Sequence, residues 1–191
     1  FHLIVAVFLL TYIYNTILFV KGNSIQWSRL NGIFNLPVVF TIFVFIQIYL
    51  GGIMAGMKAA LVAPEWPYLM GSFLPREIFQ FSNYSNFLFS EYELSHTGPV
   101  IVQFFHRLFA YSILFILILL IYNYYSRFAS KLYLIIFLVL VQILLGILTL
   151  LNSHGSVPLW YGSLHQLTGI VLLLSCIDFL SIVSNSKSLL K

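Results

Sequence analysis

The sequence predicts an all-α protein, a polytopic transmembrane bundle of five helices. Of its 191 residues 61% are hydrophobic and only 7% are charged, whereas a soluble domain carries about 25% charged residues. Lipid must therefore surround most of the chain. Five apolar stretches also approach the roughly 20 residues that cross a bilayer, and backbone polar groups in lipid must be satisfied within a helix. The stretches run about Phe1–Val20, Pro37–Gly56, Val100–Tyr124, Lys131–Leu151 and Tyr161–Val183.

The first span opens directly on Phe1, inside an apolar run and without a polar leader. We therefore expect the sequence to begin within a longer protein. Residues 23–36 are more polar than the spans and contain three Asn residues and Gly32, which predicts a linker between the first and second spans.

The segment after the second span, Met57–Pro99, holds several prolines and four of the five acidic residues. It predicts a long loop, and its Trp66-Pro67 and other aromatic residues suggest a cover over the nearby end of the bundle. Short loops then separate the remaining spans, and residues 187–191 form a polar tail.

Basic residues predict how the chain lies in the membrane. They follow the first, third and fifth spans, and loops rich in Lys and Arg stay on the cytoplasmic side. The loops 57–99 and 152–160 are then on the outer side. Because the nine basic residues are spread along the whole chain, they form no nucleic-acid patch, and the lipid bilayer is the expected partner. The residues at the inner side are Lys21, Arg29, Arg127, Lys131, Lys187 and Lys191.

Three histidines lie within a turn or two of the outer ends of their spans: His2, His106 and His165. At a rise of about 1.5 Å per residue, the last two lie roughly 9 Å and 6 Å into their helices. Two imidazoles at one depth on different helices can grip a haem iron from both sides. Arg107 suits a haem propionate. The alternative is that these histidines only hydrogen-bond neighbouring helices.

The other candidate ligands are less informative. His96 and His154 fall in outer loops among Ser, Gly and Pro, where solvated side chains are expected. The single cysteine, Cys176, lies in an apolar run, so neither an internal disulfide nor an iron–sulfur site is expected.

A short element is repeated in the second and fourth spans, as Gln47-Ile-Tyr-Leu-Gly-Gly and Gln142-Ile-Leu-Leu-Gly-Ile. Its glycines let helices or a flat macrocycle approach closely. Gln47 and Gln142 either bond a haem edge or, as we favour, another helix. By this repeat the last four spans form one haem-binding four-helix bundle that holds His106 and His165. His2 then belongs to a preceding unit, or pairs between copies in a homo-oligomer.

Several sequence elements follow one another in a characteristic order. They are Phe1-His-Leu-Ile-Val-Ala, Gln47-Ile-Tyr-Leu-Gly-Gly with Glu65-Trp-Pro-Tyr-Leu, Val102-Gln-Phe-Phe-His-Arg, and Gln142-Ile-Leu-Leu-Gly-Ile with Leu164-His-Gln. Their order and spacing resemble the last five of the eight transmembrane helices of the haem A synthase family.

This resemblance implies an oxidoreductase that converts the C8 methyl of haem O to the formyl group of haem A, for terminal oxidases. His106 and His165 would ligate a haem b cofactor, and His2 would bind the substrate haem O. Residues 1–22 would end a substrate half, 23–36 would be an inner linker, and 37–186 would be the cofactor half.

The resemblance also implies what this chain lacks. Gln103 stands where the family's other half carries a catalytic Glu. The catalytic residues are therefore expected outside this sequence, and the chain alone is expected to be inactive. The cysteine pairs that some family members carry in outer loops are absent here, which favours the cysteine-free type without a thiol-relay step. Partners would be haem O, a haem O synthase or the terminal oxidase assembly. The membrane would be a bacterial plasma membrane or a mitochondrial inner membrane, with the haem site near the outer leaflet.

Two other functions remain open from the residues. A b-type cytochrome electron carrier also uses histidines on different helices, but it usually needs them at both membrane faces. A transporter or structural subunit without haem would show charges near the membrane centre. The only acidic residue within a span, Asp178, lies near the inner face instead.

Overall fold

The computed structural model describes residues 2–30, 35–79 and 97–186, and in these ranges it is all-α, as predicted. Four helices are long and apolar enough to cross a membrane within these ranges. Short 3-10 turns lie between them. The long helices are α1 (His2–Val20), α2 (Leu36–Gly56), α4 (Thr97–Leu151) and α5 (Leu159–Asn185), and the turns are η1 (Trp27–Arg29), η3 (Ala59–Leu61) and η4 (Arg76–Phe79).

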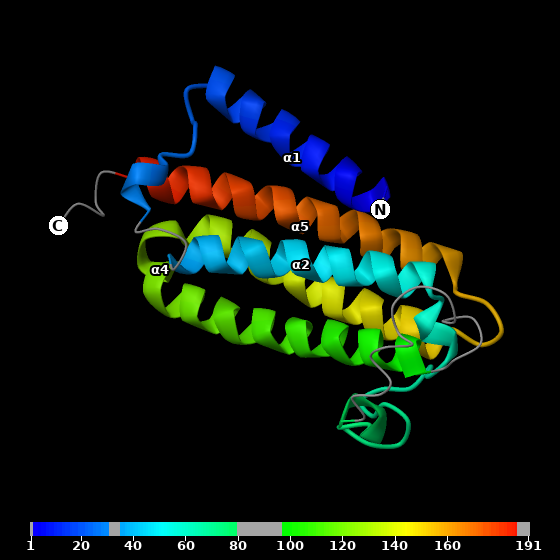
Figure 1. Ribbon diagram of the computed structural model, residues 1–191. Helices are drawn as coiled ribbons and strands as arrows, with labels where there is room; N and C mark the ends of the chain where they lie inside the picture. The colour runs from blue at the N-terminus through cyan, green and yellow to red at the C-terminus, as the bar shows by residue number, and fades with distance from the viewer. Residues whose placement is uncertain (1, 31–34, 80–96, 187–191) are drawn as a thin grey trace.

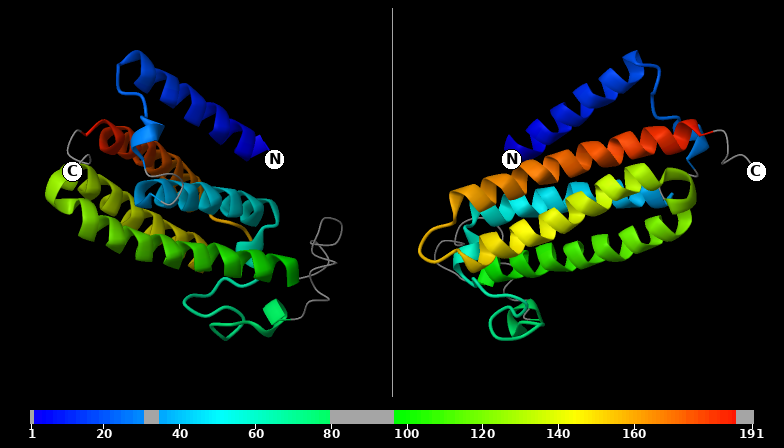
Figure 2. Two further views of the ribbon diagram at one scale, coloured as in Figure 1. Left: turned by 60° about the vertical axis from the view of Figure 1, so that its left-hand side comes forward. Right: turned by 180° about the vertical axis from the view of Figure 1, so that it is seen from behind.

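The structure has four long helices in the described ranges and not the predicted five, because the third and fourth spans are joined across a kink in α4 with no loop between them. Helix α4 has 55 residues, which would extend about 80 Å if straight, against roughly 30 Å of bilayer core. Its one non-helical residue is Phe128, with φ −132° and ψ 30°. Figures 1 and 2 show the chain reversing in α4. The loop between Arg127 and Lys131 is thus a kink, and α4 consists of two antiparallel arms, 97–127 and 129–151.

Helix α2, both arms of α4 and α5 lie side by side, and α1 crosses the bundle at an angle (Figures 1 and 2). We call the end that holds the α4 reversal the inner end, following the charge pattern. The core of the bundle is mainly apolar, and α1 adds only Val7 and Leu18 to its fully buried residues, with Leu3 and Tyr14 packed against it. The remaining surface of α1 is largely exposed, which suits contact with lipid. Core residues with almost no exposure include Phe40, Leu120, Leu132, Phe179 and Val183.

Hydrogen bonds tie the linker after α1 to the last turns of α5 at the inner end. Ser181 Oγ donates to the Asn23 carbonyl, and Asn185 Nδ2 donates to the Ser24 carbonyl at 2.8 Å. The Gln26 backbone N–H donates to Ser184 Oγ at 3.0 Å. Backbone groups at the membrane boundary need such partners, because apolar surroundings supply none. The linker is therefore held against the bundle.

An ion pair joins the second arm of α4 to α5 near the inner end. Lys131 Nζ lies 2.8 Å from Asp178 Oδ2, and their side chains are 43% and 27% exposed. Partly exposed pairs of this kind contribute little, typically about 0.2–1 kcal/mol. The acidic residue that the sequence places near the inner face therefore has a structural partner.

We expect a weak coupling between Lys131 and Asp178. A double-mutant cycle with Lys131→Ala and Asp178→Ala should give a coupling free energy of about 0.5 kcal/mol, because water and lipid headgroups reach both side chains. Unfolding of the detergent-solubilised chain by SDS, followed by helicity, measures it. Lys21→Ala paired with Asp178→Ala is the control and should show no coupling. A coupling above about 3 kcal/mol would instead indicate a fully desolvated pair.

Candidate functional site

The structure brings together two of the histidines that the sequence singled out. His106 lies in the outer half of the first arm of α4, and His165 lies in the outer half of α5. Their ring centroids are 6.4 Å apart, with 68° between the ring planes. The shared depth expected from the sequence therefore becomes a direct pairing of two imidazoles across a helix interface.

Each imidazole lies against a glycine of a neighbouring helix. A Cβ atom on Gly51 of α2 would lie 3.4 Å from His106 Cε1. A Cβ atom on Gly146, in the second arm of α4, would lie 3.1 Å from His165 Cε1. The rings therefore rest on helix backbone at places where no side chain intervenes.

The two glutamines of the repeated element form bonds between helices. Gln47 Nε2 lies 3.1 Å from His106 Nε2, so the amide N–H donates to this ring nitrogen when His106 is protonated on Nδ1. Gln142 Nε2 donates to the His165 carbonyl at 2.8 Å and to Thr168 Oγ1. One glutamine therefore contacts an imidazole directly, and the other holds the backbone of the histidine's helix.

Several polar atoms around this pair are left without partners. The Nδ1 atoms of His106 and His165 and the Oε1 atom of Gln47 are buried and form no hydrogen bond in the described part of the chain. Leaving a buried polar group unpaired costs about 1–3 kcal/mol. Buried polar atoms left unpaired in a native structure often mark a functional site, such as one that binds an ion or a ligand.

The distance between the two imidazoles is compatible with both binding one haem iron. A metal–imidazole bond is about 2.0–2.1 Å, and the ring centre lies about 1 Å further out, so two imidazoles on opposite sides of one metal are roughly 6 Å apart. The observed 6.4 Å between centroids is close to this separation. Two protein ligands are also the number that a bis-histidine haem takes, because the macrocycle supplies the others.

Arg107 has different partners from the propionate that the sequence suggested. Its Nη1 atom donates to the carbonyls of Pro67 and Tyr68 at 3.2 and 2.6 Å, and its Nη2 atom donates to the Glu65 carbonyl at 2.7 Å. Three of its five N–H donors are thus used by the segment after α2. The guanidinium anchors this segment to the outer end of α4.

Gln103 adds a second anchor that the sequence reasoning missed. It is 1% exposed, and its Nε2 atom donates to the Ala63 carbonyl at 3.2 Å. Gln103 and Arg107 are four residues apart and so share one helix face. This spacing of two polar residues within an apolar helix was the available signal. Together they hold residues 63–68 at the outer end of the bundle.

The remaining candidate ligands stay outside the site. His2 is exposed in the first turn of α1, and His154 is exposed in the loop after α4. His96 lies outside the described residues. Within the described ranges, no group of three His, Cys, Asp or Glu side chains is placed to hold a metal ion.

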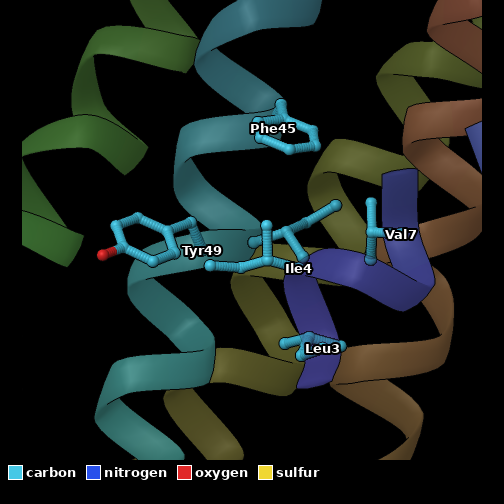
Figure 3. Close-up of a pocket in the computed structure, with 6 residues that line it drawn as sticks. Leu3, Ile4, Val7, Phe45 and Tyr49 are labelled. Atoms are coloured by element: carbon cyan, nitrogen blue, oxygen red, sulfur yellow. The ribbon is translucent and has the colours of Figure 1, made fainter. Parts of the chain in front are cut away.

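The packing next to His2 leaves no room for a large ligand between α1 and α2. Figure 3 shows apolar side chains of the two helices converging there. The cavity between them measures about 10 Å³, which is roughly one water molecule's probe sphere. Leu3 closes this contact, since a Cβ on Gly52 would lie 2.7 Å from its Cδ2 atom. The cavity is lined by Leu3, Ile4, Val7, Phe45, Ile48 and Tyr49.

Comparisons with known proteins find a matching family model and several related proteins. A family model described as cytochrome oxidase assembly protein matches residues 1–177. A protein named heme A synthase from Pelagibacter ubique is 35% identical over 188 residues, which cover 97% of this chain and 52% of that protein. Heme A synthase from Neorickettsia sennetsu is 33% identical over 168 residues, which cover 86% of this chain and 46% of that protein.

A third relative, heme A synthase from Bartonella tribocorum, is 38% identical over 138 residues, or 69% of this chain and 36% of that protein. The chain thus spans about half the length of the first two relatives. No solved structure matches it significantly.

We expect Arg107→Ala to release the segment that follows α2. Losing three hydrogen bonds from a charged donor should favour opening of residues 63–68 by on the order of 2 kcal/mol, or about 30-fold. Limited proteolysis with chymotrypsin, followed at Tyr68 and Phe73, measures this opening in detergent. Arg76→Ala, an exposed arginine of the same outer region, is the control and should leave the cleavage rate unchanged. Equal cleavage of the Arg107→Ala variant and the parent chain would contradict the anchor.

Proposed function

We propose that this chain, which belongs to the haem A synthase family of cytochrome oxidase assembly proteins, provides the family's haem b binding half. The observation that carries the proposal is the pair His106 and His165, two imidazoles 6.4 Å apart on adjacent helices. Their buried, unpaired Nδ1 atoms and their fit to opposite sides of one metal support it.

The histidines would hold the iron of haem b, which supplies reversible one-electron transfer when bound. Gln47 occupies the Nε2 lone pair of His106 in the structure, so its amide has to turn away when this nitrogen binds a metal. Gln142 keeps α5 in register with the second arm of α4 through the His165 carbonyl. Two of the five N–H donors of Arg107 are not used by any described residue, and they would suit a propionate carboxylate at the outer end.

The oxidation of the C8 methyl of haem O would belong to the whole protein and to its other half, while this half would hold a haem b. Gln103 supports the assignment of residues 37–186 to the cofactor half rather than to the oxidising half. A side-chain amide is neutral and is not basic enough to act as a general base, and the Nε2 atom of the buried Gln103 donates to the Ala63 carbonyl. Helix α1, with its exposed His2, would be the last helix of the substrate half.

The proposal also implies where in the cell the protein is located and which molecules it interacts with. The four long apolar helices mark an integral membrane protein, and the relatives compared are bacterial. We therefore place the chain in a bacterial plasma membrane, with the histidine pair near the outer leaflet. Haem O and the terminal oxidase assembly pathway would be its partners, and the chain by itself would not form haem A.

We expect the purified chain to give a sharp low-spin b-type signal in a dithionite-reduced minus oxidised visible spectrum. His106→Ala and His165→Ala should each lose this signal and reduce bound haem by at least about tenfold, because one axial ligand is removed. His154→Ala, which changes an exposed loop histidine, is the control and should keep the full signal.

A folded, helical and monodisperse parent chain without haem would overturn the proposal. Retention of the low-spin signal in both variants would show that residues other than His106 and His165 bind the haem iron.

A further inference from the structure

The repeated Gln-x-x-x-Gly element occurs once in α2 and once in the second arm of α4, and the structure places each copy beside one histidine. We propose that Gly51 and Gly146 are positioning residues that set the place and the plane of the two ligand imidazoles. This inference rests on the haem-binding function proposed above. The two glycines act on His106 and His165 respectively.

Contact distances show that the His165 ring lies across Gly146. A Cβ atom there would lie 3.1 Å from Cε1, 3.6 Å from Nδ1 and 3.7 Å from Nε2 of His165. Three ring atoms at similar distances mean that much of the ring covers this point of the helix backbone. The nearest contact is tighter than nearly all real Cβ contacts, so a methyl group would push the ring by a few tenths of an ångström.

The contact of His106 with Gly51 has the same form but is looser. A Cβ atom on Gly51 would lie 3.4 Å from Cε1 and 4.0 Å from Nδ1 of His106. The first distance is at the lower edge of ordinary van der Waals contact. A methyl group at Gly51 is therefore tolerated with a smaller shift of the ring than one at Gly146.

Packing against glycine matters here because the usual alternative is missing from the described structure. A metal-binding histidine normally donates its second ring N–H to a carboxylate, a carbonyl or water, and this bond fixes the ring plane. The Nδ1 atoms of His106 and His165 are buried and have no such partner in the described residues. The helix backbone at each glycine then limits how the ring can rotate.

The glutamine one turn inward completes each element. Gln47 holds the ring of His106, and Gln142 holds the backbone of His165. A Cβ atom on Gly169 would lie 3.5 Å from Gln142 Oε1, so this glutamine also packs closely against α5. These ties fix the register of the helix pairs, which keeps each glycine opposite its histidine.

Gly56 provides a matched control on α2, because a Cβ atom there would have nothing within 4 Å. Alanine also favours helix more than glycine does, so a Gly→Ala change by itself does not weaken these helices. A loss of haem or a changed haem signal in Gly146→Ala is therefore not explained by poorer helix formation.

The experiment compares the parent chain with Gly146→Ala, Gly51→Ala and Gly56→Ala, each purified in detergent and titrated with haem b. Haem per protein and the g values of the ferric low-spin electron paramagnetic resonance spectrum are measured, because these g values depend on the angle between the axial imidazole planes. We expect Gly146→Ala to bind haem about 10- to 100-fold more weakly, the range for changes that disturb a ligand's support. Gly51→Ala should keep its haem with shifted g values, and Gly56→Ala should match the parent.

Each outcome decides between the two proposals. If the parent chain binds low-spin haem and all three variants match it in affinity and g values, the positioning role is overturned and the proposed function stands. If the parent chain binds no haem, both are overturned. If Gly146→Ala does not yield a monodisperse protein, Gly51→Ala decides alone, and unchanged g values in that variant overturn the inference.

Discussion

The bundle depends on one constraint, the absence of water between its helices. A polar group there must find a partner on another helix or remain unpaired at a cost. Most polar side chains in the described core satisfy this rule locally. Gln103 and Arg107 bind carbonyls of the segment after α2, and Gln142 binds the backbone of α5. Bonds of this kind between membrane helices average only about 0.6 kcal/mol each, so they specify register more than they add stability.

The exceptions among the described residues are six buried side-chain atoms without a hydrogen-bond partner: Thr11 Oγ1, Asn35 Oδ1, Gln47 Oε1, Gln103 Oε1 and the Nδ1 atoms of His106 and His165. The imidazole rings of these two histidines each lie against a glycine of a neighbouring helix. The proposed haem site rests on this pair of imidazoles, whose ring centroids are 6.4 Å apart.

The outer and inner ends of the bundle are secured differently. At the outer end, Arg107 gathers three carbonyls of one segment with a single side chain. At the inner end, side chains from the last turns of α5 bind the linker after α1, and Lys131 pairs with Asp178. Helix α1 makes little contact between these ends, and its exposed apolar surface suits lipid or further membrane helices. The four packed segments, α2, the two arms of α4 and α5, can then present the histidine pair without help from α1.

The sequence by itself determined the solvent, the helical class and the depth of the histidines. Composition excludes a water-facing surface, lipid requires helices, and the rise per residue sets how deep His106 and His165 lie. It also singled out the two Gln-x-x-x-Gly elements. The sequence predicted a reversal between the third and fourth spans, and only the tertiary structure decided that it is a kink at the single non-helical residue Phe128 and not a loop, because no Gly or Pro near Phe128 marks the position. It also decided that Arg107 binds carbonyls and that each glycine meets an imidazole. These contacts depend on how each helix is rotated about its axis and on the register between helices. Packing against side chains of other segments sets both, and no local sequence pattern encodes them.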